Sequence, residues 1–109
     1  MFKDQTNRLH KKALLVAKNY KQAEIELIEI LELVEKARLF YKMGYSSLFT
    51  YATQASGLSN EISYIYIRVA RKTQEVPELK KEIAAGAISV SKARKICSVL
   101  TKENQRHWL

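Results

Sequence analysis

The chain has 109 residues, 47% of them apolar and 28% charged, with three glycines and one proline, and its net charge is +8. This composition predicts a single domain, residues 1–109, and excludes a low-complexity or disordered chain. The positive charge favours polyanionic partners. No apolar run reaches the roughly 18 residues that span a bilayer, and residues 1–10 lack the apolar core of a secretory signal, so we expect a cytoplasmic protein without a membrane segment.

The charge is unevenly distributed. Residues 1–21 contain six Lys or Arg and one Asp, whereas residues 22–35 contain five Glu and no basic residue, so these segments carry +5 and −5. Residues 36–109 hold thirteen basic and five acidic residues, a net charge of +8. An anion-binding site is therefore expected in residues 36–109.

Residues 1–43 predict a long helical hairpin. The apolar residues of its first helix recur at helical spacing: Leu9, Ala13, Val16 and Ala17. Asn19 predicts a weak break, and from Tyr20 a second, longer helix runs to Gly44, which is expected to end it in a left-handed conformation.

The longer helix is apolar on two sides. One side gathers Ala23, Leu27, Ile30, Leu31, Val34, Ala37 and Tyr41. The other carries Ile25, Ile28 and Leu39. One face is covered either by the first helix or by a second protomer. In the second case Ile25, Ile28 and Leu39 would form the interface of a homodimer.

Residues 44–109 predict four more helices and a helix-turn-helix-like hairpin. Ser46 is expected to cap a short helix that ends before Gly57, and Ser59 to cap a helix that ends near Gln74. Pro77 suits the first turn of the next helix. Its end is expected at Gly86, a further helix starts at Ser89 or Ser91, and Thr101 caps a terminal stub. No segment alternates convincingly between apolar and polar residues, so the fold class is all-α, with about six helices.

The helix after Ser59 has two different sides. Its core side is Ile62, Ile65, Tyr66, Val69, Ala70 and Thr73, flanked by Ser63 and Ile67. Its exposed side is Asn60, Glu61, Tyr64, Arg68, Arg71 and Lys72. Asn and Arg pair with base edges, and Tyr and Lys hold phosphates, so Asn60, Tyr64, Arg68, Arg71 and Lys72 are candidate contacts to duplex DNA. The alternative is an ordinary solvated face.

A second basic edge follows on the next two helices. Its residues are Lys80, Lys81, Lys92, Arg94 and Lys95. These side chains could hold phosphates without reading sequence. The rival reading is a protein-interaction module, in which the basic residues only maintain solubility.

Catalytic chemistry finds no support in the sequence. His10 and His107 lie in no metal-binding motif, and there is no glycine-rich phosphate loop. The glutamates of residues 22–35 accompany an apolar stripe rather than a pair converging in a cleft. Cys97 is expected to be a small buried apolar residue. We therefore expect a non-enzymatic binding module without a metal or a cofactor.

Most of the chain, from about Leu14 to Leu100, resembles the helical region that precedes the nuclease domain in a group of bacterial HNH-endonuclease-family proteins. The matching residues are Leu31, Glu35 and Arg38, GYSSLFTYATQASGLS (44–59), Tyr64, Ile67 and Arg71, and VPELKKEIAAGAIS (76–89). A weaker likeness joins the turn, the helix capped by Ser59 and GAISVSKAR (86–94) to the DNA-binding core of ParB-type partition proteins. Both resemblances imply a bacterial, DNA-associated helical module.

The chain departs from the first family in two places. The family tends to have Tyr-Arg-Arg-Ile where this chain has Tyr64-Ile65-Tyr66-Ile67, which removes two basic residues and leaves Arg68 and Arg71. No His-Asn-His constellation follows, so nuclease activity is not implied.

Overall fold

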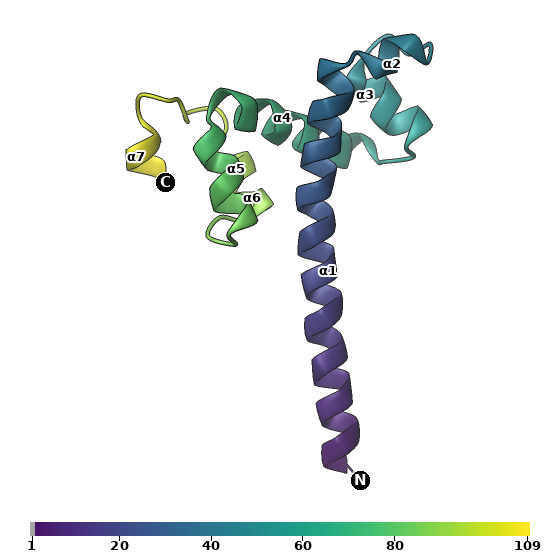
Figure 1. Cartoon of the computed structure of the whole chain (residues 1–109), viewed down its shortest axis with the longest axis vertical. Coiled ribbons are helices and arrows are strands. Elements are labelled where there is room, and N and C mark those ends of the chain that lie inside the picture. Colours follow the sequence, from purple (N-terminus) through teal and green to yellow (C-terminus); the bar gives the residue numbers. More distant parts are fainter. Residues whose placement is uncertain (1) are drawn as a thin grey trace.

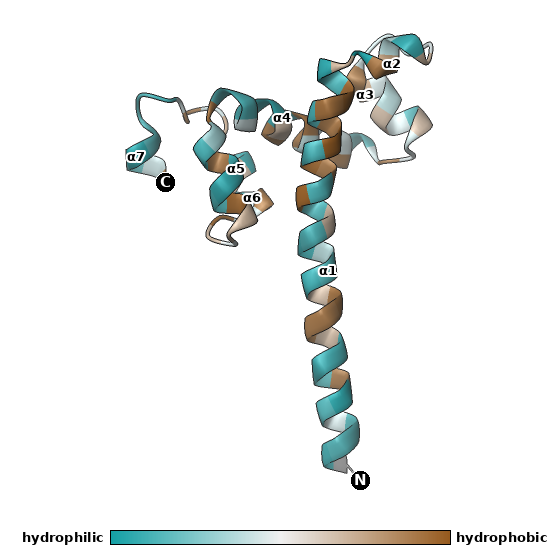
Figure 2. Cartoon of the chain, viewed as in Figure 1, coloured by the Kyte–Doolittle hydropathy of each residue, from teal (hydrophilic) through white to brown (hydrophobic). Residues whose placement is uncertain are grey.

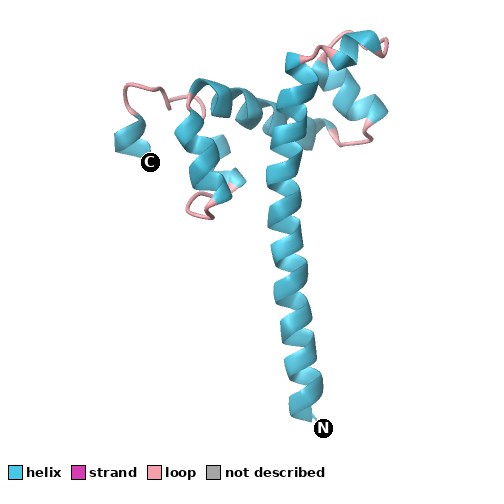
Figure 3. Cartoon of the chain, in the orientation of Figure 1, coloured by secondary structure: helices cyan, strands magenta, loops and turns pink. Residues whose placement is uncertain are grey.

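A computed structural model describes residues 2–109, which form an all-α fold without a strand (Figures 1 and 3). This confirms the predicted fold class. The elements are α1 (Phe2–Lys36), α2 (Leu39–Lys42), α3 (Leu48–Thr50), the π-helix η1 (Tyr51–Ala55), α4 (Asn60–Glu75), α5 (Pro77–Ala84), α6 (Val90–Ile96) and α7 (Gln105–Trp108). None of these helices is long and apolar enough to cross a bilayer.

Helix α1 is one uninterrupted helix of 35 residues, so the predicted hairpin of residues 1–43 is wrong. Asn19 does not break it, because asparagine in a helix costs less than about 0.7 kcal/mol relative to alanine and its neighbours favour the helix. The N-terminal half of α1 extends away from the other helices (Figure 1). It therefore cannot fold back to cover the second half of the same helix.

The chain turns at Arg38, which joins α1 to α2. Arg38 has φ 52° and ψ 35°, a left-handed conformation in a residue other than glycine. Its carbonyl oxygen accepts from the backbone N–H groups of Tyr41 and Lys42, and its guanidinium lies 5.6 Å from the centre of the Tyr41 ring. These contacts hold a conformation that usually costs about 1–2 kcal/mol.

Helix α4 is the centre of the fold and contacts α1, α3, η1, α5 and α6. Its buried side chains meet a core that every major element joins: Ile28, Leu31, Val34, Leu48, Ala52, Tyr66, Ile67, Val69, Ala70, Val76, Leu79, Ile83, Ile88, Val90, Ala93, Ile96, Cys97 and Leu100. Most of the predicted core side of α4 is confirmed. Ile62 is an exception because it is 38% exposed, and Ser63 and Ile67 are fully part of the interior.

The predicted dimer interface of Ile25, Ile28 and Leu39 is not an exposed apolar surface. Ile28 is 2% exposed, and Ile25 is partly buried against the same core, because α4 lies across this side of α1. Leu39 is 37% exposed and lies beyond the turn at Arg38. The three residues therefore do not share an open face of one helix.

The helix starts follow the local signals closely. Ser59 Oγ accepts from the Ile62 N–H and Pro77 opens α5, as predicted. Of the two predicted starts of α6, Ser89 rather than Ser91 is the cap, and its Oγ accepts from the Lys92 N–H. The cap of α3 is Ser47 rather than Ser46, since the Ser47 hydroxyl accepts from the Thr50 N–H. These caps fix where α4 and α6, which carry the candidate site, begin.

Candidate nucleic-acid interface

The first half of α4 presents an open polar surface. Asn60 and Tyr64 are exposed, and Arg68 is half-buried one turn further along. The Arg68 guanidinium lies 5.7 Å from the centre of the Tyr64 ring, which orients it by a cation–π contact. No ion pair found among residues 2–109 involves Arg68. Its charge is therefore available to an anion.

A shallow hollow of about 350 Å³ adjoins this surface, between α3 and α4. Its lining is Ser47, Phe49, Tyr64, Ile67, Arg68 and Arg71. The hollow thus combines two guanidinium groups with two aromatic rings, of which Phe49 is 39% exposed. Guanidinium groups recognise phosphate, and aromatic rings provide stacking surfaces for bases or sugars.

Arg71 is committed to a contact within the chain. Its Nη2 and Nε donate to the carboxylate of Glu35 at 2.7 and 3.0 Å, and these bonds raise the pKa of Arg71. This pair joins α4 to the end of α1. The prediction of Arg71 as a free contact is therefore revised, because an anion at this guanidinium would compete with Glu35.

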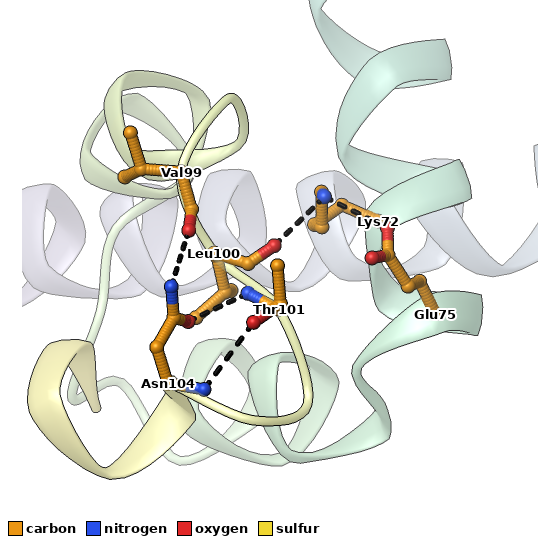
Figure 4. Close-up of polar contacts among 6 residues, drawn as sticks. All are labelled: Lys72, Glu75, Val99, Leu100, Thr101 and Asn104. Carbon is orange, nitrogen blue, oxygen red and sulfur yellow. Dashed lines mark hydrogen bonds and ion pairs between the residues drawn. The ribbon is translucent and has the colours of Figure 1, made fainter.

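Lys72 also has partners within the chain, shown in Figure 4. Its ammonium donates to Glu75 at 2.7 Å and to the Leu100 carbonyl oxygen at 2.9 Å. Just beyond Leu100, the Asn104 side chain accepts from the Thr101 N–H, and the Thr101 hydroxyl accepts from the Asn104 N–H. Lys72 thus links the C-terminal segment to α4 through hydrogen bonds. Because its ammonium group already has these partners, we exclude Lys72 from the candidate DNA-contact surface.

The two lysines of α5 are similarly paired. Lys80 Nζ lies 3.6 Å from a carboxylate oxygen of Glu32 on α1, and Lys81 Nζ lies 3.8 Å from Glu78. Ion pairs at or near the surface are weak, but they reduce the positive charge that α5 offers to a partner. The predicted basic edge is therefore concentrated on α6.

On α6, Lys92, Arg94 and Lys95 are all exposed. None of them takes part in an ion pair within residues 2–109. The buried residues Val90, Ala93 and Ile96 alternate with them and hold the opposite side of α6 in the core. The three cations consequently form an unopposed basic surface.

Helix α6 packs against α4, and Cys97, at the C-terminal end of α6, is buried in the core. Burial raises the pKa of this thiol, while the positive charges of Arg68 and Lys72 act in the opposite direction. The candidate residues of α4 and α6 that are exposed or half-buried and take part in no ion pair within residues 2–109 are Asn60, Tyr64, Arg68, Lys92, Arg94 and Lys95, and we call this set the basic face.

Within residues 2–109, no group of three or more His, Cys, Asp or Glu side chains is arranged to hold a metal ion. Comparison of the chain with protein-family models, curated proteins and solved structures finds no match. The geometry of residues 2–109 thus carries the functional argument.

Ser47 and Phe49 belong to the candidate site, although no sequence pattern indicates them. Their place on α3 depends on how α3 packs against α4, which no local pattern reports. The sequence pattern that points to this region is a short helix followed by the turn at Gly57 and the helix capped by Ser59.

Proposed function

We propose that this chain is a non-enzymatic module that binds duplex DNA through the basic face. The observation that supports the proposal is that some of the predicted basic contacts are paired within the chain and others are not. Four basic side chains predicted as contacts have partners within the chain, whereas Arg68, Lys92, Arg94 and Lys95 form no ion pair within residues 2–109. When unpaired surface cations contact the phosphates of DNA, they displace counterions condensed on the duplex, and the release of these ions favours binding.

The position of the open residues on α4 supports the same function. In a helix-turn-helix module, residues near the N-terminus of the second helix reach the bases. Asn60 and Tyr64 lie there, directly after the turn at Gly57 and the cap at Ser59, and both are exposed. The C-terminal half of α4 is instead tied to α1 and to the C-terminal segment.

The resemblance to the helical region of HNH-endonuclease-family proteins is consistent with a DNA-associated role. The loss of two basic residues at Ile65 and Tyr66 does not remove Arg68, and both positions face inwards or are half-buried in this chain. We therefore assign phosphate contacts mainly to Arg68 and α6, and propose the cytoplasm of a bacterium as the setting.

Anisotropy titrations of a labelled duplex test the assignment. Arg68→Ala should weaken binding and lower the slope of log K against log salt by about 0.9, the value expected for one phosphate contact. The triple change Lys92→Ala, Arg94→Ala and Lys95→Ala should lower it by up to about three times as much.

Arg106→Ala is the matched control, because this exposed arginine lies on α7 beside a different hollow with Glu78 and Glu82. Arg106→Ala removes one positive charge, as Arg68→Ala does, but should leave the slope of log K against log salt nearly unchanged. Equal losses for Arg68→Ala and Arg106→Ala would contradict the basic face as the contact surface.

A protein-interaction module without DNA contact is the second candidate. The exposed apolar residues of α1, which include Leu9, Val16 and Tyr20, favour it. If no variant of the chain binds a duplex, this reading replaces the first.

A further inference from the structure

The projecting half of α1 carries apolar side chains that no other described element of the chain covers. Figure 2 shows apolar bands on this half, below the level at which the other helices pack. Leu9 is 71% exposed, Val16 53% and Tyr20 65%. A single helix of this kind, without tertiary contacts, is only marginally stable in water. Binding of a partner to this surface would bury the exposed apolar side chains and stabilise the helix.

These residues belong to a regular heptad pattern. Steps of four and three residues alternate along Leu9, Ala13, Val16, Tyr20, Ala23, Leu27, Ile30 and Val34. A sustained repeat of this kind is the signature of a coiled coil, in which these are the a and d positions. The last of them, Val34, is buried in the chain's own core, whereas Ile30 is 51% exposed. The seam thus runs from Leu9 to Ile30, and within it Leu27 is partly buried against the chain's own core.

The charge of α1 selects the direction of the partner helix. Residues 1–21 carry +5 and residues 22–35 carry −5. Two parallel copies would place like charges side by side along the whole seam. Two antiparallel copies would place the basic segment of each against the acidic segment of the other, which is attractive. Glu24, Glu32 and Glu35 already have partners within the chain, so this attraction comes mainly from Glu26 and Glu29, which form no ion pair or side-chain hydrogen bond within residues 2–109.

We propose that α1 pairs with α1 of a second copy of this chain in an antiparallel coiled coil. In the register that matches a positions with d positions, Leu9 faces Leu27 of the second copy, Ala13 faces Ala23, and Val16 faces Tyr20. Lys12 then flanks the seam opposite Glu26 of the second copy, and both side chains are exposed. This pair occurs twice in the dimer by symmetry.

A hollow beside the seam suits this arrangement. It measures about 220 Å³ and lies between α1 and α4, lined by Tyr20, Ala23, Glu24, Leu27, Ile62 and Tyr66. Ile62, which the sequence places in the core, is 38% exposed at this site. Side chains from the N-terminal part of the second copy's α1 would lie along it. This inference is independent of the proposed binding of DNA.

Sedimentation equilibrium of the full chain tests the dimer. Wild-type protein should be dimeric at micromolar concentration, and Val16→Glu should weaken association at least about 100-fold, because it buries two carboxylates at the centre of the seam. Leu15→Glu is the matched control. Leu15 is 50% exposed but lies outside the heptad positions, so its change should leave association within about 3-fold of wild type, a surface-type effect.

The direction of the helices is tested separately. Lys12→Glu should weaken the dimer, and Glu26→Lys added to it should restore association, because both symmetric pairs form again with reversed charge. Association should also weaken as salt increases. Leu9→Cys should not form a disulfide-linked dimer, since the two Leu9 positions would lie about 27 Å apart at 1.5 Å per residue.

Three results would overturn the proposal. One is a wild-type protein that stays monomeric up to high micromolar concentration. Another is equal loss of association in Val16→Glu and Leu15→Glu. The third is rapid oxidation of Leu9→Cys to a disulfide-linked dimer, which is the behaviour of a parallel coiled coil.

Discussion

Val69 shows how a single residue couples α4 to the rest of the molecule. It is 0% exposed, at the centre of the helix that contacts most other elements. Val69→Ala removes two methyl groups from a packed core and should lower the free energy of unfolding by about 1–3 kcal/mol. Val99→Ala, at a site that is 44% exposed, should change it by less than about 0.5 kcal/mol. Chemical denaturation measures both, and similar losses would contradict the assignment of Val69 to the core.

The environment of Tyr66 predicts that the free energy of unfolding decreases at alkaline pH. Burial and a hydrogen bond to Glu24 raise the pKa of its phenol well above the usual value. In the unfolded chain the phenol ionises near pH 10, so the folded state is stabilised fully below that pH and loses this contribution as pH rises towards the folded pKa.

Tyr66→Phe should therefore be less stable than wild type at neutral pH but should lose less stability between about pH 9 and pH 11. Denaturation curves across this range measure the difference. Tyr64→Phe, at an exposed tyrosine, serves as the control and should follow the wild-type profile. Parallel pH profiles for wild type and Tyr66→Phe would show that Tyr66 titrates normally.

The turn at Arg38 gives a prediction at the level of the element. Its left-handed conformation is unfavourable for any residue with a Cβ atom, while glycine adopts it freely. Arg38→Ala loses the contact with the Tyr41 ring and keeps the strain, whereas Arg38→Gly loses the contact and relieves the strain. The glycine variant should thus be the more stable of the two by about 1 kcal/mol. The reverse order, which is normal inside a helix, would contradict the left-handed turn.

Where the elements begin could be predicted because the signals are local. Ser59, Pro77 and Gly86 each act on their own turn of the chain, and the structure confirms the role of each. Of the two predicted starts of α6, Ser89 and Ser91, the structure has Ser89, whereas the predicted cap Ser46 is replaced by its neighbour Ser47. The end of α1 could not be predicted, since nothing in its sequence distinguishes Arg38 from the residues around it. The weak signal at Asn19 was wrong because the surrounding residues favour the helix.

The candidate site could be predicted only in outline. Helical periodicity places Asn60, Tyr64 and Arg68 on the open side of α4, and the structure agrees. The partners of the other cations come from distant parts of the chain. Arg71 meets Glu35 and Lys80 meets Glu32 across the contact of α1 with its neighbours. A pattern confined to one helix holds no information about such pairs.

At the scale of the whole molecule, the two proposals combine. An antiparallel pair of α1 helices would place the two positions of Ile28, where α1 meets the core, about 30 Å apart along the coil at 1.5 Å per residue. This separation is similar to one turn of duplex DNA, about 34 Å. The dimer would then offer two basic faces to one duplex, and linked sites bind more tightly than separate ones.

Val16→Glu should therefore reduce the affinity for a duplex of about 30 base pairs by at least 10-fold, a modest effect for the loss of bivalent binding. It should have little effect on a duplex of about 10 base pairs, because a duplex roughly 34 Å long leaves no room for two binding sites whose centres lie about 30 Å apart. Leu15→Glu adds the same negative charge and controls for simple repulsion. Equal losses on both duplexes would show that the lost affinity does not come from bivalent binding, and no loss on either would show that the two faces act independently.

The most direct test of the central claim is the affinity of the wild-type chain for duplex DNA as a function of salt, measured by anisotropy. The basic face predicts dissociation constants on the order of 10⁻⁴ to 10⁻⁶ M at physiological salt. As the salt concentration is lowered towards 50 mM, log K should rise steeply and linearly with decreasing log salt. Absence of binding at about 50 mM salt, or binding that does not change between 50 and 200 mM, would contradict a phosphate-contacting function for this protein.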